Sequence, residues 1–206
     1  MTLFIIATPI GNLADITLRA LDTLKKVKFI CAENPRHSQR LLKHYKIETS
    51  LKPLSQTMGA LERGEDVALI SDAGTPAISD PGSKIVSEAL AKDHIVVPIP
   101  GPSALVTALS VAGVGFNRFL FLGFLPHKKG RTKMIKEMIS SQRPVVFYES
   151  PHRIFKILGL LPRDREVVVC RELTKLYETI YRGKVGEILE ILKQKKVRGE
   201  FVVLLK

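Results

Sequence analysis

The chain contains only two cysteines, Cys31 and Cys170, and they lie far apart in separate apolar stretches. A secreted disulfide scaffold or a zinc knuckle needs more cysteines at closer spacing, so both classes are disfavoured and a reducing cytoplasm is expected. The longest apolar run, residues 119–125, is far shorter than the roughly 18 residues of a membrane span. Met1 leads directly into a short β-like run, so we expect neither a signal peptide nor a membrane partner.

Several common site motifs are also missing. No Gly-x-x-x-x-Gly-Lys-Ser/Thr run occurs, which excludes a phosphate-binding loop of that type. Residues 113–115 begin a Gly-x-Gly-x-x-Gly pattern, but Arg118 replaces its third glycine. Ser103 lacks the final glycine of a hydrolase elbow, so it is interpreted as a helix-start residue rather than a nucleophile. Among the histidines only His37 and His44 show a regular spacing, and we expect no metal site.

Positive charge, by contrast, is abundant. The 206 residues include 32 Lys and Arg against 20 Asp and Glu, a net charge of +12, while hydrophobic residues make up 45%. That composition is typical of a folded domain that can bury a core, and the length suits one large domain or two small ones. The excess of positive charge favours a polyanionic partner such as nucleic acid. Net charge indicates a class of partner but does not locate a binding site. A protein can also be basic without binding nucleic acid.

The first half of the chain repeats one pattern, in which a short apolar run is followed by a loop and then by a helical segment. This alternation predicts a parallel sheet with right-handed crossovers. Asp15 is placed to cap the first helix, and Pro81 and Pro102 stand where helices can begin, because proline needs no N–H partner there. The predicted strands are 3–7, 29–32, 67–70 and 95–99, and the predicted helices are 16–27, 35–45, 81–92 and 102–112.

Two glycines and several polar residues at 113–118 interrupt this pattern and indicate a hinge. A boundary there predicts an N-terminal α/β domain of residues 1–114 and a C-terminal α/β domain of residues 115–206. The final apolar run, 201–205, is free to pair antiparallel because no crossover follows it. The other strands predicted in the second half are 119–124, 145–148 and 166–170, and its predicted helices are 131–141, 151–160 and 185–195.

The loops that follow the predicted strands are rich in glycine and proline. Ligands of open parallel sheets bind beyond the carboxyl ends of the strands, glycine lets a backbone approach a ligand, and proline holds a loop in one shape. Ordinary turn chemistry explains any one such loop. Five of them at strand ends together favour a ligand site, and these loops are 7–12, 71–76, 100–104, 148–153 and 171–175.

The same loops carry motifs that resemble the ribosomal RNA small subunit methyltransferase I family, within the tetrapyrrole methylases. The resemblance spans nearly the whole chain, and the motifs are specific as a set although each is weak by itself. The matching motifs are Ala7-Thr8-Pro9-Ile10-Gly11-Asn12-Leu13, Ser71-Asp72-Ala73-Gly74-Thr75-Pro76, Pro100-Gly101-Pro102-Ser103-Ala104, Tyr148-Glu149-Ser150-Pro151-His152-Arg153, Arg171-Glu172-Leu173-Thr174-Lys175 and Gly199-Glu200-Phe201.

This resemblance implies a two-domain α/β fold of the tetrapyrrole methylase type, also called a class III methyltransferase fold, with a parallel N-terminal and a mixed C-terminal sheet. It further implies S-adenosylmethionine in a cleft between the domains and a homodimer. The expected activity is methylation of a cytidine ribose 2′-hydroxyl in the decoding region of 16S ribosomal RNA, with the rRNA or the small ribosomal subunit as partner.

The resemblance also assigns cofactor contacts to residues of these loops. Asp72 is the sharpest of them, although a turn carboxylate that accepts a hydrogen bond from its own loop is the alternative on local grounds. The assigned cofactor contacts are Pro9, Asp72, Ala73, Gly74, Ile78, Ser103, Ala104, Tyr148 and Leu173.

Methyl transfer to a hydroxyl needs alignment of the reacting atoms and a base that takes the hydroxyl proton. Glu149 and His152 are the favoured catalytic candidates, and a structural ion pair with a neighbouring arginine is the alternative for each carboxylate. Arg171 or Lys175 is suited to hold phosphate. The other candidates for the base are Glu33, His37 and Glu172.

Two basic segments, 127–131 and 193–198, are candidate phosphate contacts, although such runs are commonly solvated faces. Two departures from the family pattern stand out. The segment from Ser55 to Val67 is shorter than is usual in the family, and no helical tail follows Leu205. Two other functions therefore stay open: a small-molecule methylase of the tetrapyrrole type, and an RNA-binding assembly factor without catalytic activity.

Overall fold

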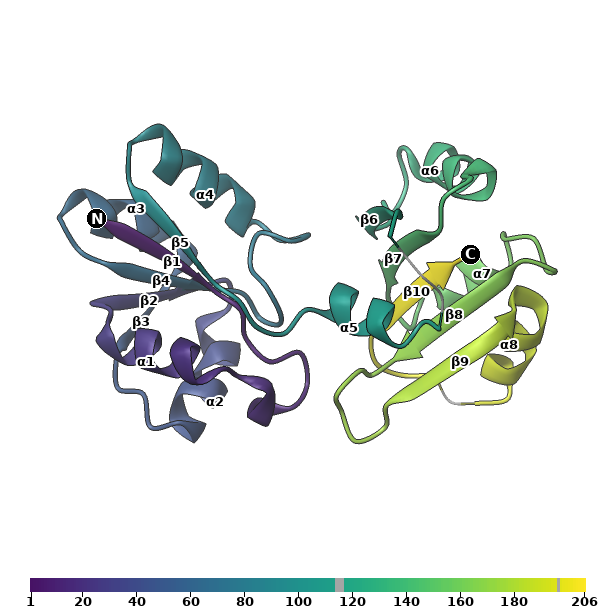
Figure 1. The fold of residues 1–206 in the computed structure, drawn as a ribbon, viewed down its shortest axis with the longest axis horizontal. Coiled ribbons are helices and arrows are strands. Elements are labelled where there is room, and N and C mark those ends of the chain that lie inside the picture. Colours follow the sequence, from purple (N-terminus) through teal and green to yellow (C-terminus); the bar gives the residue numbers. More distant parts are fainter. Residues whose placement is uncertain (114–116, 196) are drawn as a thin grey trace. The chain divides into compact units, whose positions relative to one another are not determined.

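The computed structural model describes residues 1–113, 117–195 and 197–206, and these divide into two compact units, Met1–Ser103 and Ala104–Lys206 (Figure 1). The predicted boundary between residues 114 and 115 lies outside the described residues. Residues 104–113 group with the second unit, because the helix α5 (Ala104–Ser110) packs against the strand β10 (Phe201–Leu205).

The first unit has one sheet of five strands in the order β3-β2-β4-β1-β5, and every neighbouring pair is parallel. The predicted parallel sheet is therefore confirmed. Its elements are β1 (Thr2–Ile6), η1 (Leu13–Asp15), α1 (Leu18–Lys26), β2 (Phe29–Ala32), α2 (Pro35–His44), β3 (Ser50–Pro53), η2 (Leu54–Gln56), α3 (Thr57–Glu62), β4 (Val67–Ile70), α4 (Gly82–Ala91) and β5 (Ile95–Ile99).

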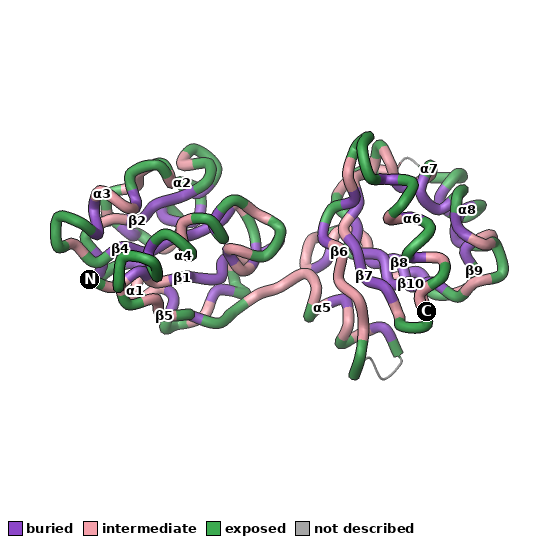
Figure 2. The backbone as a smooth tube through the Cα atoms, turned by 90° about the horizontal axis from the view of Figure 1, so that it is seen from above, coloured by how far each residue is buried: buried purple, intermediate pink, exposed green. Residues whose placement is uncertain are grey.

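Helices cover both faces of this sheet. Leu24 of α1 and Leu42 of α2 pack against one face, whereas Leu61 of α3 and Ala89 of α4 pack against the other. All four residues of β4 are buried, as expected for a strand covered on both sides. Figure 2 shows these buried strands beside helices whose outer surfaces are exposed. Because all five strands are parallel, the loops that follow their carboxyl ends emerge from the same edge of the sheet.

Side-chain caps explain where the helices of the first unit begin. Thr17 caps α1, because its hydroxyl accepts a 3.1 Å hydrogen bond from the amide of Ala20, so the prediction that Asp15 is the cap was wrong. Asn34 caps α2, whose first residue is the predicted Pro35. Pro81 and Pro102 stand just before α4 and α5 rather than inside them.

The second unit contains a mixed sheet in the order β6-β7-β10-β8-β9. β6 and β7 are parallel, whereas β10 runs antiparallel to both β7 and β8, which confirms the pairing expected for the last apolar run. The elements of this unit besides α5 and β10 are β6 (Leu120–Phe124), α6 (Arg131–Ser140), β7 (Val145–Glu149), α7 (Ile154–Leu158), β8 (Glu166–Arg171), β9 (Thr179–Lys184) and α8 (Val185–Lys193).

Among the described residues, the elements without a predicted counterpart are the edge strands β3 and β9, the short turns η1 and η2, and the short helix α3, which occupies the shortened segment after Ser55. Both cysteines, Cys31 and Cys170, are buried and unbridged. Within the described ranges, no helix has the length and apolar character needed to cross a membrane.

Candidate functional site

Three loops of the first unit are joined at the carboxyl edge of its sheet. The amide of Thr8 donates to the carbonyl of Gly74 at 2.9 Å, and the amide of Gly74 donates back to the carbonyl of Thr8 at 3.0 Å. The hydroxyl of Thr75 donates to the carbonyl of Pro102 at 3.0 Å. Main-chain hydrogen bonds therefore join the loops after β1 and β4, and the Thr75 hydroxyl joins the loop after β4 to the loop after β5.

Glycine is required at two positions of this edge. Gly74 has a left-handed φ of +79°, and a Cβ there would lie 3.3 Å from Cγ2 of Ile10. At Gly101, a Cβ would lie 3.1 Å from the Cβ of Ala7, tighter than an ordinary contact. The close approach of these loops to each other therefore depends on both glycines.

Asp72 links a fourth loop to this edge. Its Oδ1 accepts a hydrogen bond of 3.2 Å from the amide of Asn34, the residue that caps α2. The partner thus lies on the loop after β2 and not within the turn of Asp72 itself. Part of this side chain remains exposed, since Asp72 is only partly buried.

Asp80 holds the outer part of the loop after β4, a role that the sequence did not reveal. Its Oδ1 accepts hydrogen bonds from the amides of Ala77 at 2.9 Å and Gly82 at 2.7 Å. Ala77 and Ser79 both have positive φ values, 68° and 65°, which non-glycine residues rarely adopt. Asp80 therefore stabilises the strained backbone that presents Ile78, whose side chain is 45% exposed.

The carboxyl edge of the first unit carries a concentration of negative charge. Burial raises the pKa of the Glu33 carboxyl, and the nearby charges of Asp72 and Asp80 raise this pKa further. These three groups come from the loops after β2 and β4. The edge thus favours a positively charged ligand.

Six of the nine predicted cofactor contacts share this edge of the first unit. Gly74 is buried, Ala73 and Ile78 are exposed, and the others are partly buried. The six residues are Pro9, Asp72, Ala73, Gly74, Ile78 and Ser103. The other three, Ala104, Tyr148 and Leu173, belong to the second unit.

Within the second unit, Tyr148 on β7 lies beside the start of α5. Burial raises the pKa of Tyr148, and a backbone hydrogen bond at Leu105 partly offsets this rise. The neighbouring residue Ala104 is therefore close to Tyr148. The tyrosine ring also contacts the rings of Phe121 and Phe124, each with a centroid distance of 5.2 Å.

Glu149, a predicted catalytic residue, is buried among arginines. Its side chain is 0% exposed, and its Oε1 lies 2.7 Å from Nε of Arg153. The other carboxylate oxygen lies 4.0 Å from Nη2 of Arg131. Arg153 in turn donates to the carbonyl of Leu125 at 2.9 Å. This carboxylate has the ion-pair environment that was the alternative to a catalytic role.

His152, the second predicted catalytic residue, is exposed in the turn between β7 and α7. It follows Glu149 by three residues, so the buried ion pair holds the turn that displays it. Glu33 and His37, which were further candidates, are exposed in the first unit, on the loop after β2 and in the first turn of α2.

Glu172, another candidate, stabilises the loop after β8. Its Oε1 accepts hydrogen bonds from Nζ of Lys175 at 2.8 Å and from the amide of Glu200 at 3.0 Å. Nζ of Lys175 also lies 2.9 Å from the carboxylate of Glu200. Leu173 is buried under this network, being 6% exposed, and Arg171 donates to the carbonyl of Arg198 at 2.8 Å.

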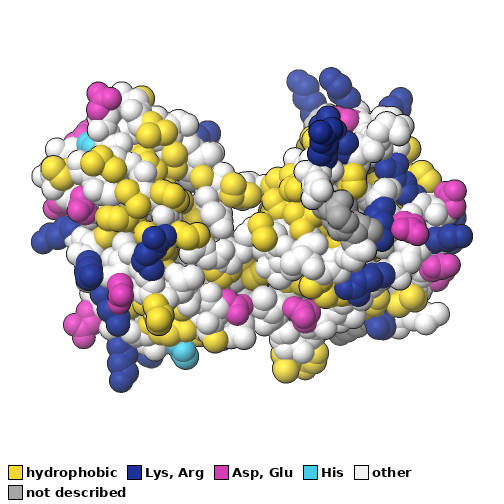
Figure 3. Space-filling view, viewed as in Figure 1, with side chains coloured by type: hydrophobic (Ala, Val, Ile, Leu, Met, Phe, Trp, Pro, Cys, Tyr) yellow, Lys and Arg dark blue, Asp and Glu magenta, His cyan; other side chains and the backbone are white. Residues whose placement is uncertain are grey.

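Positive charge gathers on the second unit around α6, as Figure 3 shows. The predicted basic segment 127–131 leads into this helix, and its members His127, Lys128 and Lys129 are exposed, whereas Arg131 is buried. Of the other predicted segment, 193–198, residue 196 lies outside the described residues.

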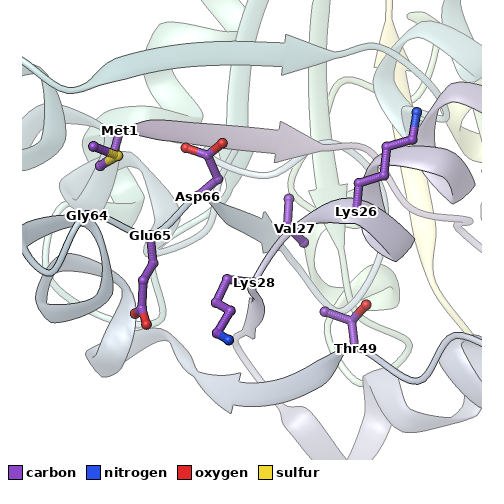
Figure 4. Close-up of a pocket in the computed structure, with 8 residues that line it drawn as sticks. All are labelled: Met1, Lys26, Val27, Lys28, Thr49, Gly64, Glu65 and Asp66. Carbon is purple, nitrogen blue, oxygen red and sulfur yellow. The ribbon is translucent and has the colours of Figure 1, made fainter.

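A hollow of about 460 Å³ lies at the opposite end of the first sheet (Figure 4). Asp66, Lys28 and Met1 are among its lining residues, which come from the amino ends of the strands. None of the predicted site residues lines it, and it carries both charge signs.

Comparison with known proteins identifies this architecture. The family model of the Tetrapyrrole (Corrin/Porphyrin) Methylases matches residues 2–189. The chain belongs to this family. Tetrapyrrole methylases use S-adenosylmethionine as the methyl donor, so this chain is a methyltransferase with that cofactor.

Curated relatives of this tetrapyrrole methylase share its whole length. A protein of Thermotoga maritima named ribosomal RNA small subunit methyltransferase I is 42% identical, and the match covers 98% of this chain and 97% of the relative. A protein of the same name from Escherichia coli O157:H7 is 45% identical, over 98% of this chain and 76% of the relative. The resemblance drawn from the loop motifs is therefore confirmed.

A solved structure supports the fold of this methylase. The X-ray structure of cobalt precorrin-4 methyltransferase, a cobalamin biosynthetic enzyme, matches with a TM-score of 0.73, over 99% of this chain and 94% of that one. The sequence identity is 15%, so this likeness concerns the fold alone.

The residues at the carboxyl edge of the first unit fit S-adenosylmethionine. This cofactor carries a positively charged sulfonium, and the carboxylates of Asp72 and Glu33 lie close enough together that the charge of Asp72 raises the pKa of Glu33. Main-chain groups near Gly74 and the exposed side chain of Ile78 add polar and apolar contacts suited to the adenosine part.

Proposed function

We propose that this methylase transfers a methyl group to a cytidine ribose 2′-hydroxyl in the decoding region of 16S ribosomal RNA. The observation that carries the proposal is the near-complete match to relatives named ribosomal RNA small subunit methyltransferase I. The net charge of +12 supports an RNA substrate, because phosphate contacts supply most of the affinity of such complexes. The substrate is then the rRNA or the small subunit, and the enzyme works in the cytoplasm as a homodimer.

In this proposal, residues from both units hold the cofactor. When bound, S-adenosylmethionine supplies an electrophilic methyl carbon. Asp72 and Gly74 provide a carboxylate and a close-approaching backbone, while Tyr148 and Leu173 contribute from the second unit. Pro9, Ala73, Ile78, Ser103 and Ala104 complete the set of proposed cofactor contacts.

His152 is the proposed base for the ribose hydroxyl. Its exposure allows an RNA to reach it, whereas the carboxylate of Glu149 is fully buried and paired with Arg153. Glu149 therefore contributes as a positioning residue that holds the turn of His152. Alignment of the hydroxyl supplies most of the rate in such a transfer, and the base removes the proton that the ribose oxygen loses.

The decisive experiment incubates the protein with S-adenosylmethionine labelled in its methyl group and with small subunits or 16S rRNA. Label on a cytidine 2′-oxygen, lost in His152→Ala but retained in the control variant His94→Ala, which removes a partly buried histidine just before β5, supports the proposal. Label on a base, or only on an added tetrapyrrole, would contradict it. RNA binding without any transfer would instead indicate an assembly factor.

A further inference from the structure

The exposed face of α2 carries positive charge without negative charge. The chain contains no acidic residue between Glu33 and Glu48. Over this stretch the buried side of the helix consists of Ser38, Leu41 and Leu42, and the remaining surface is largely basic. The exposed basic side chains are Arg36, His37, Arg40, Lys43, His44 and Lys46.

This arrangement differs from that of α8 and of the end of α4, where lysines are paired with acids. On α8, Nζ of Lys193 lies 3.1 Å from the carboxylate of Glu190, three residues earlier, and Lys92, just after α4, pairs with Glu88 of α4 at 3.5 Å. Among the described residues, no ion pair joins Arg36, Arg40 or Lys43 to an acid. A surface that only has to be soluble usually mixes positive and negative side chains. Solubility therefore does not explain a helix face that carries positive charge alone.

Helix stability does not account for the charges either. Arg36 stands in the first turn of α2, where the helix dipole favours negative rather than positive side chains. Arg36 and Arg40 are four residues apart, and like charges at that spacing repel each other. The arrangement costs stability in the free protein, and a bound polyanion would remove that cost.

The position of α2 connects this face to the candidate cofactor loops. The helix starts at the carboxyl edge of β2, and its cap residue Asn34 donates its amide to Asp72 at 3.2 Å. Both belong to the first unit, so their relation does not depend on the second unit. From Arg36 to Lys43 the helix advances about 10 Å, enough to follow a short stretch of backbone phosphates leading to the edge.

We infer that Arg36, Arg40 and Lys43 of α2 bind the phosphodiester backbone of the RNA substrate and direct it toward the loop of Asp72. The inference rests on the proposed function and adds to it a contact surface on the first unit. Both basic segments predicted from the sequence lie on the second unit, so this surface is a separate one.

The test compares two double variants that remove equal charge from helices on the same face of the first sheet. Arg36→Gln/Arg40→Gln alters the proposed surface. Lys25→Gln/Lys26→Gln is the matched control, because both lysines are exposed in the last turn of α1, at the amino edge of the sheet. Glutamine keeps a similar helix propensity in both cases.

The readouts are the affinity for 16S rRNA as a function of salt and the affinity for S-adenosylmethionine by calorimetry. Loss of two phosphate contacts should reduce the slope of log affinity against log salt by about 1.4 to 1.8, and weaken RNA binding about tenfold or more at low salt. The control variant should match the parent, and both variants should bind the cofactor as the parent does.

The outcomes separate the two proposals. If the parent protein neither binds nor methylates the RNA, the proposed function fails, whatever the variants do. If the parent methylates RNA and the α2 variant matches the control in slope and affinity, the inference about α2 is overturned. A loss confined to assembled subunits, with binding to free rRNA intact, would show that the face contacts a protein and would overturn it too.

Discussion

In the first unit, hydrogen bonds without ion pairs join the loops beyond the strands, as between Thr8 and Gly74, whereas in the second unit the ion pair of Lys175 with Glu200 joins two loops. At this edge Asp72 accepts one backbone hydrogen bond and remains partly exposed. In the second unit, Glu149 forms an ion pair with Arg153 and Glu172 forms one with Lys175. A carboxylate near a strand end is thus a candidate ligand contact in the first unit and a structural group in the second.

The largest expected effect comes from removing the buried charge of the second unit. Glu149→Gln leaves Arg153 and Arg131 without their counter-charge, and breaking such a buried pair costs about 3–5 kcal/mol of unfolding free energy. Urea denaturation followed by circular dichroism measures the loss. Glu190→Gln, which removes the exposed ion pairs of Glu190 with Arg163 and Lys193, is the control and should leave the midpoint unchanged. Equal stability of the Glu149 variant and the parent would refute a structural role for this pair.

An intermediate effect is expected in the first unit, on ligand binding and not on folding. Asp72→Ala should weaken S-adenosylmethionine binding about tenfold or more, as expected when a charged hydrogen-bonding group is lost from a ligand site. Its melting temperature should stay near that of the parent. Calorimetric titration and thermal unfolding of the apo-protein measure the two quantities.

Asp66→Ala is the matched control for this variant. Oδ1 of Asp66 also accepts one backbone hydrogen bond, from Thr2 at 2.8 Å, but at the amino edge of the same sheet. Both variants therefore lose one similar contact within the fold. Equal cofactor affinities of the two would remove Asp72 from the site.

The smallest expected effect is on the pH dependence of folding stability, to which Glu172 in the second unit and Glu33 in the first contribute with opposite signs. Burial alone would raise the pKa of Glu172, but hydrogen bonds from Lys175 and the backbone of Glu200 hold it below its ordinary value. Such a group stabilises the fold above the ordinary glutamate pKa of about 4.3, and this stability is lost as pH falls through the folded-state pKa. For Glu33 the pKa is raised, so its ionisation destabilises the fold above the folded-state pKa.

Acidification should therefore destabilise the loop after β8 and relieve the repulsion around Glu33. Carboxyl resonances followed by NMR titration report the two pKa values directly, and Glu33→Gln and Glu172→Gln assign them. If the pKa values of Glu33 and Glu172 were both raised or both lowered from the ordinary value, this difference between the units would be refuted.

The fold was predictable where local signals agreed with each other. Apolar runs such as that of β4, followed by glycine- and proline-rich loops, predicted the parallel sheet, and the absence of a following crossover predicted the antiparallel β10. The edge strand β3 was missed because its residues Ser50–Pro53 are half exposed and carry no apolar pattern. The start of α1 was misplaced because Asp15 and Thr17 are both suitable caps, and only Thr17 reaches a free amide.

The sequence predicted which loops share the edge of the first sheet, whereas the structural roles of single residues were harder to predict, and the cofactor contacts stay a prediction. Loop motifs located Asp72 and Gly74 at one edge, yet the role of Asp80 depends on the backbone turn at Ala77 and was not visible. The burial of Glu149 depends in part on Arg131, which is eighteen positions earlier in the chain and approaches only after β6 and β7 have paired. Long-range pairing of this kind leaves no local pattern.

The place of β10 in the second sheet has a consequence for biosynthesis. This strand is the last one in chain order, yet it fills the middle of the sheet between β7 and β8. Until β10 has been synthesised and has paired, β7 and β8 each present an unpaired edge that other chains can bind. The first unit has all five of its strands by residue 99, so its sheet can form earlier in translation, while the sheet of the second must wait for β10.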